Sequence, residues 1–61
     1  MDAATTLAIL GSADRAALVL LTLHNQLQEA GREDWARLAW VAHLEAAQSA
    51  DTMSTALGLS E

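Results

Sequence analysis

Two histidines, His24 and His43, are the side chains with the clearest capacity for chemistry. A tetrahedral zinc site requires three or four ligands, and the chain has no cysteine. Glu29 and Glu45 are possible further ligands, but no two such residues are spaced to share one helix face. We therefore expect no metal and no cofactor. His24 falls within an apolar arc, where we expect it to be hydrogen-bonded or interfacial.

Nucleophilic catalysis finds no support in the sequence. The serines fall at predicted caps, helix ends or the tail, and the three glycines are isolated, so they form no phosphate-binding loop. A catalytic carboxylate pair requires a dry pocket that shifts one pKa, and a chain of 61 residues has little room for one. The sequence predicts a protein that is not an enzyme.

Composition predicts a helical protein that needs a partner. Alanine and leucine dominate, and proline is absent, which favours helix. A chain this short buries only about 60% of its unfolded surface, so a monomer is marginal. Without cysteine the chain cannot be stabilised by disulfide bonds, and oligomerisation is the remaining common way to stabilise so small a fold. The lack of cysteine also fits a cytoplasmic location.

The net charge of −5, with three arginines and no lysine, limits the classes of partner. A basic footprint for nucleic acid is missing, and anionic membrane surfaces should repel the chain. The longest apolar run, 16–21, is far shorter than the roughly 20 residues of a spanning helix. We expect neither a nucleic-acid partner nor a membrane.

The helical pattern predicts an all-α fold, a helical hairpin of two long helices. These cover 13–30 and 32–50, with Gly31 as the left-handed residue of the turn. Glu33 and Arg37 are spaced for an ion pair on the second helix. The whole chain, 1–61, is predicted to form one interaction domain.

Short helical segments are predicted at both ends of this hairpin. Asp2 caps the first, Gly11 ends it, and Ser12 caps the long helix that follows. The alternative is one continuous helix through Gly11, at a cost of about 1 kcal/mol. At the other end Asp51 or Thr52 caps a last turn, which Gly58 ends.

Each long helix has more apolar surface than one neighbour can cover. On the first, alternate steps of three and four predict a seam made of Ala13, Ala16, Leu20, Leu23, Leu27 and Ala30. The second has two apolar faces: one with Trp35, Leu38, Ala39, Ala42 and Ala46, and one with Ala36, Trp40, Leu44 and Ala47. One face packs in the hairpin, and the other needs cover from the short terminal helices or from another chain. The simplest assembly is a dimeric four-helix bundle.

The candidate site is therefore an interface. Its predicted residues are Leu20, Leu23, Leu27, Trp35, Leu38, Trp40 and Leu44, since large apolar side chains and tryptophan dominate contacts between proteins. The predicted partners are a second copy of the chain and a larger protein.

Three hypotheses for function follow. The first is a free-standing regulator, inhibitor or adaptor that docks apolar helix faces on a larger protein. The second is a docking or dimerisation module of a multi-subunit enzyme assembly, in a chain that continues beyond this sequence. The third is a small metal-binding bundle, which only His24 and His43 support.

Overall fold

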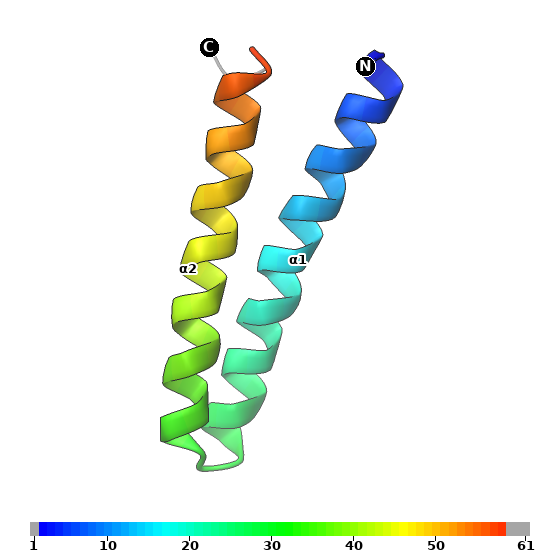
Figure 1. Cartoon of the computed structure of the whole chain (residues 1–61). Coiled ribbons are helices and arrows are strands. Elements are labelled where there is room, and N and C mark those ends of the chain that lie inside the picture. Colours follow the sequence, from blue (N-terminus) through cyan, green and yellow to red (C-terminus); the bar gives the residue numbers. More distant parts are fainter. Residues whose placement is uncertain (1, 59–61) are drawn as a thin grey trace.

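Gly31 joins two long α-helices into an antiparallel hairpin in a computed structural model of the chain, which describes residues 2–58. Helix α1 spans Ala3–Glu29 and helix α2 spans Glu33–Ala56. The molecule is 44 Å long and about 16 Å across, and the start of α1 and the end of α2 lie at the end away from the turn (Figure 1). The predicted all-α helical hairpin is confirmed.

The turn closes by the hydrogen-bond pattern that a left-handed glycine permits. Gly31 has φ +77°. The Arg32 N–H donates to the Leu27 carbonyl at 2.9 Å, and the Gly31 N–H donates to the Gln28 carbonyl at 3.0 Å. This pair of bonds satisfies the last carbonyls of α1 in a Schellman motif. The prediction for Gly31 is confirmed.

Asp2 caps α1, as predicted. Its Oδ1 accepts a hydrogen bond from the Thr5 backbone N–H at 2.7 Å. This bond lowers the pKa of Asp2 below its ordinary value of 3.8. Because the folded pKa is the lower one, the cap stabilises fully above the ordinary pKa and is lost as the pH falls through the lowered value.

The predicted break at Gly11 is wrong, and so is the separate helical segment at the C-terminal end. Helix α1 runs through Gly11 without interruption, and α2 runs past Asp51 to Ala56. Ser12 does not cap a helix, because its hydroxyl donates to the Ala8 carbonyl at 3.0 Å. A helical glycine costs only about 1 kcal/mol, so packing against α2 outweighs it. Gly58, with φ +74°, follows the end of α2 as predicted.

Replacing Gly11 with alanine is expected to raise the free energy of unfolding by about 1 kcal/mol. A Cβ at Gly11 would meet nothing within 4 Å. Gly31→Ala is the matched opposite. A Cβ at Gly31 would also meet nothing within 4 Å, but the residue has a φ of +77°. Alanine in this conformation is therefore expected to destabilise the protein by about 1–2 kcal/mol. Thermal unfolding followed by circular dichroism measures both, and destabilisation by Gly11→Ala would contradict a continuous α1.

The seam between the two helices follows a heptad pattern on each. On α1 the buried and half-buried positions of the seam are Thr6, Leu10, Ala13, Ala17, Leu20, His24 and Leu27. On α2 they are Ala36, Ala39, His43, Ala46, Ala50 and Met53. The most buried of these are small, with Ala36 at 1% exposure. Small residues at the crossing bring the two helices close together.

The predicted seam of α1 is therefore partly wrong. Ala13, Leu20 and Leu27 face α2, whereas Ala16, Leu23 and Ala30 are exposed. Ala17 and His24 take the positions that had been predicted for Ala16 and Leu23. The leucine-rich stripe of α1 thus lies partly beside the seam rather than in it.

Candidate interaction surface

Apolar side chains that nothing covers are the main feature of the surface. None of the large side chains within residues 2–58 is fully buried. The large apolar residues that are exposed are Leu7, Ile9, Leu18, Val19, Leu23, Trp35, Leu38, Trp40, Val41, Leu44 and Leu57. A hairpin has two sides flanking its seam, and the helical repeat of 3.6 residues assigns most of these residues to one side or the other.

We call the first side the Trp35 face. Its α1 residues are Ile9, Ala16, Leu20, Leu23 and Leu27, and its α2 residues are Trp35, Leu38, Ala42, Ser49 and Met53. Leu38 is 68% exposed and Trp35 is 51% exposed. No charged residue lies among these positions, and Glu45 lies only at the edge.

Arg32 closes the turn end of the Trp35 face. Its guanidinium lies 3.6 Å from the centre of the Trp35 ring and 3.4 Å from a carboxylate oxygen of Asp34. The hydrogen bond from Arg32 lowers the pKa of Asp34 below 3.8. Asp34 and Arg32 form the one ion pair between side chains in the described part of the chain. The predicted pair of Glu33 and Arg37 is therefore wrong for this structure.

We call the second side the Trp40 face. Its α1 residues are Leu7, Asp14, Leu18, Leu21 and Gln28, and its α2 residues are Glu33, Arg37, Trp40, Leu44 and Asp51. The helices share it, because one hollow joins Gln28 to Arg37 and Trp40, and another joins Leu7 and Asp14 to Asp51. In contrast to the Trp35 face, it mixes leucines with charges.

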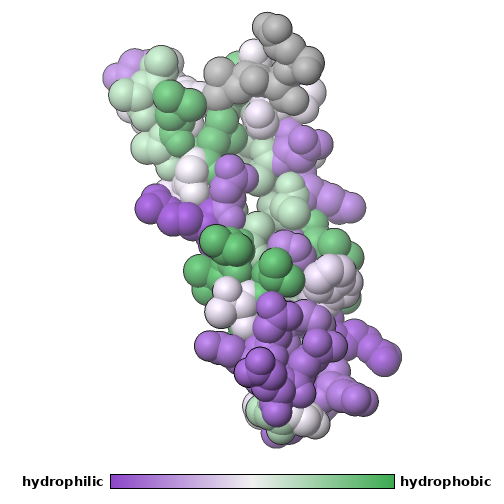
Figure 2. Space-filling view, turned by 180° about the vertical axis from the view of Figure 1, so that it is seen from behind, coloured by the Kyte–Doolittle hydropathy of each residue, from purple (hydrophilic) through white to green (hydrophobic). Residues whose placement is uncertain are grey.

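Figure 2 shows how surface character changes along one side of the molecule. Hydrophobic surface gathers in a band across the middle and again at the open end, whereas the turn end is mostly hydrophilic. The hydrophilic end corresponds to a polar stretch of sequence around the turn, 25–34. On this side of the molecule, the apolar surface therefore lies away from the turn.

The two histidines join the helices to each other. Nδ1 of His24 lies 2.7 Å from the carbonyl oxygen of Ala36, and Nδ1 of His43 lies 2.7 Å from that of Ala17. A carbonyl only accepts, so each Nδ1 carries a proton and donates it. The Trp40 ring lies beside both imidazoles, with centroid distances of 5.2 Å to His24 and 5.3 Å to His43. The expectation of a hydrogen-bonded His24 is confirmed.

A spacing in the sequence could have revealed these bonds. Ala17 and His24 are seven residues apart on α1, and Ala36 and His43 are seven apart on α2. When two such helices pair antiparallel, each histidine meets the alanine of the other. The large ring of one helix then covers the small residue of its neighbour at two layers of the seam.

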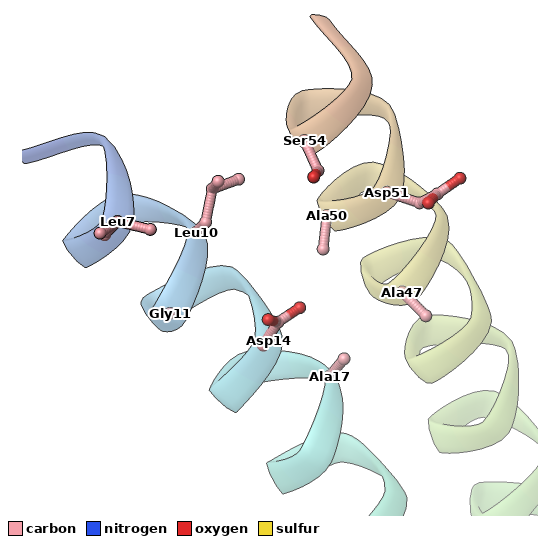
Figure 3. Close-up of a pocket in the computed structure, with 9 residues that line it drawn as sticks. All are labelled: Leu7, Leu10, Gly11, Asp14, Ala17, Ala47, Ala50, Asp51 and Ser54. Carbon is pink, nitrogen blue, oxygen red and sulfur yellow. The ribbon is translucent and has the colours of Figure 1, made fainter. Parts of the chain in front are cut away.

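The helices diverge toward their free ends and leave an open notch (Figures 1 and 3). It encloses about 610 Å³ and is lined by Leu7, Leu10, Gly11, Asp14, Ala17, Ala47, Ala50, Asp51 and Ser54. Leu10 points into it from α1 (Figure 3). The lining mixes apolar side chains with three polar ones, Asp14, Asp51 and Ser54, and the notch is open to solvent.

The predicted interface residues differ in where the structure places them. Leu20 and Leu27 are half-buried at the edge of the seam, and the other five are exposed. Trp40 and Leu44 lie on the Trp40 face and the remaining five on the Trp35 face. The structure therefore divides the predicted site between two surfaces on opposite sides of the hairpin.

Metal ligands do not gather in the described part of the chain, where no group of three or more histidine, aspartate or glutamate side chains could hold an ion. Helix α1, in contrast, is long and apolar enough to cross a membrane, with a mean hydropathy of 1.6 over its most apolar window. The short apolar run in the sequence did not predict this. Core helices and signal sequences have the same length and composition.

The fold and surface together define an all-α helical hairpin with two uncovered apolar faces. Comparison with protein-family models, curated proteins and solved structures found no match. Its function must therefore be argued from its own residues.

Proposed function

We propose that this chain is a small acidic interaction protein without enzymatic activity, which acts as a regulator or adaptor by docking an apolar helix face on another protein. The main support is the set of large apolar side chains that the hairpin leaves exposed on both sides. Contiguous exposed apolar surface marks sites of protein or membrane contact. The open hollows between the helices offer no enclosed site for chemistry.

The Trp40 face suits a different protein as partner. It has Leu18, Trp40 and Leu44 at its centre, with Asp14 and Asp51 toward the open end. An apolar centre with a charged rim is the usual anatomy of an interface between proteins that also exist apart. The acids favour a partner that is basic or neutral around an apolar patch.

A protein partner fits α1 better than a bilayer does. Asp14 and Arg15 lie near the middle of the 27-residue helix. Such residues at the centre of a spanning helix cost about 2.5–3.5 kcal/mol each on insertion scales. In a hairpin at a protein surface they remain in water. We therefore propose a cytoplasmic location for the protein.

Capture from the source cell tests this proposal. The tagged hairpin should retain one protein in stoichiometric amount from the soluble fraction. Leu18→Glu should abolish this retention, because Leu18 is 61% exposed on the Trp40 face and a buried unpaired charge is costly. Gln26→Glu makes the same charge change on the exposed polar side of α1 and should retain the partner.

Three outcomes would contradict the proposal. One is equal capture by wild type and Leu18→Glu, and another is recovery of the hairpin itself only from the membrane fraction. The third is no capture at all. An open reading frame that extends beyond either end would favour the alternative, a docking module of a multi-subunit enzyme. Bound metal in the purified protein would favour the third hypothesis, a metal-binding bundle.

A further inference from the structure

We propose that the Trp35 face is covered by a second copy of this chain, which makes a twofold dimer with four helices. This inference rests on the proposed function and assigns one of its two faces. The dimer leaves the Trp40 face of each copy free for a different protein.

The amount of exposed surface supports a dimer. The chain exposes 4487 Å², whereas a compact monomer of 6.4 kDa exposes about 3,800 Å². The excess is roughly 700 Å². A standard interface buries about 800 Å² on each partner. One interface of ordinary size would therefore bring this chain to the exposure that is normal for its mass.

Charge decides which face the second copy covers. Each chain carries −5, so two copies repel unless their contact lies away from the acids. The centre of the Trp35 face carries no charge. The Trp40 face carries three acids, Asp14, Glu33 and Asp51, against one base, Arg37. Burying that face against itself would desolvate charges that lack partners.

Side-chain size on the Trp35 face also suits helix packing. Small residues at Ala16, Ala42 and Ser49 let another helix approach closely, and Leu23 and Leu38 supply large side chains to fill the space between helices. Leu23 and Leu38 are 41% and 68% exposed in the single hairpin. Alternation of large and small residues is what lets facing helices interdigitate.

A matched pair of substitutions on α2 tests the assignment. Leu38→Glu places a charge on the Trp35 face, and Leu44→Glu places the same charge on the Trp40 face. Sedimentation equilibrium should give wild type and Leu44→Glu about twice the chain mass of 6.4 kDa. Leu38→Glu should raise the dissociation constant by about 30-fold or more, the loss typical of an interface hot spot.

A second pair on α1 checks the result independently of α2. Leu23→Glu should also dissociate the dimer, and Leu18→Glu should not. Circular dichroism at high concentration confirms that each variant is helical. If Leu44→Glu or Leu18→Glu dissociates the dimer and the Trp35-face variants do not, the face assignment is wrong. The proposed function is not affected by that result. A wild-type protein that stays a folded monomer at concentrations up to about 100 μM overturns the dimer. The capture experiment separately decides the proposed function.

Discussion

Ala36→Leu is expected to unfold most of the protein at temperatures where the wild type is folded. Ala36 is 1% exposed, the lowest exposure given for any residue of the seam. Its carbonyl also accepts the bond from His24. A leucine here has no space, and overpacking a close crossing costs about 1–3 kcal/mol. A domain of this size has roughly 3–9 kcal/mol of total stability, so the loss is a large fraction of it.

Thermal and urea unfolding, followed by circular dichroism, measure this loss. Ala8→Leu is the matched control, because Ala8 is exposed on α1 and a surface substitution changes stability by about 0.5 kcal/mol or less. The expected order of stability is wild type and Ala8→Leu together, with Ala36→Leu well below. Equal midpoints for all three proteins would show that the helices do not pack closely at Ala36.

Local features at the helix ends could be predicted from sequence because each depends on a few neighbouring residues. The left-handed conformation at Gly31 and the cap at Asp2 were both predictable. Gly11 shows the limit of local reasoning. A glycine permits a break but does not require one, and the choice depends on whether both halves of the helix can pack on the same neighbour. Thr6 is buried and Leu10 is half-buried on the same stripe of α1 as Ala17, so the helix continues.

The sequence of α1 alone could not predict which of its residues form the seam, because the apolar arc of α1 is too broad. A seam through Leu23 and one through His24 both follow alternate steps of three and four. Hydrophobicity favours Leu23, and the structure selects His24, which gains a carbonyl partner across the seam. The choice depends on α2, whose small residues meet the imidazole. Neither helix alone contains that information.

The choice of His24 over Leu23 for the seam also explains where the exposed apolar surface lies. Had Leu23 lain in the seam, the hairpin would have covered more of its own leucine surface. With His24 and Ala17 in that seam instead, Leu23 remains on the Trp35 face at 41% exposure. The sequence predicted an excess of apolar surface, and the structure shows which residues provide it.

Removing both imidazoles is the second substitution with a large expected effect. His24→Ala and His43→Ala each delete one hydrogen bond between the helices, worth about 0.5–1.5 kcal/mol, and also leave a space where the ring covered an alanine. We expect each to cost about 1–3 kcal/mol. The double variant should lose most of its helical signal at 25 °C, because a lone helix of this length is marginal in water.

Leucine at the same positions separates the hydrogen bond from the packing. His24→Leu and His43→Leu keep Ala36 and Ala17 covered. The two carbonyls retain their bonds within the helix, so no buried acceptor is left without a partner. We expect these variants to lie within about 1 kcal/mol of wild type. If leucine costs as much as alanine, the bond itself determines the stability, and the packing explanation is wrong.

Coupling between the histidines is the last part of this prediction. Because both rings lie about 5 Å from the Trp40 ring, removal of one should alter the position of Trp40 against the other. A double-mutant cycle with the alanine variants should therefore depart from additivity by at least about 0.5 kcal/mol. Because the double variant is largely unfolded at 25 °C, its unfolding by urea is measured in a stabilising osmolyte. Its free energy of unfolding is then obtained by linear extrapolation to zero urea. In Trp40→Leu the two losses should become additive, and persistence of the coupling there would show that it does not pass through the indole.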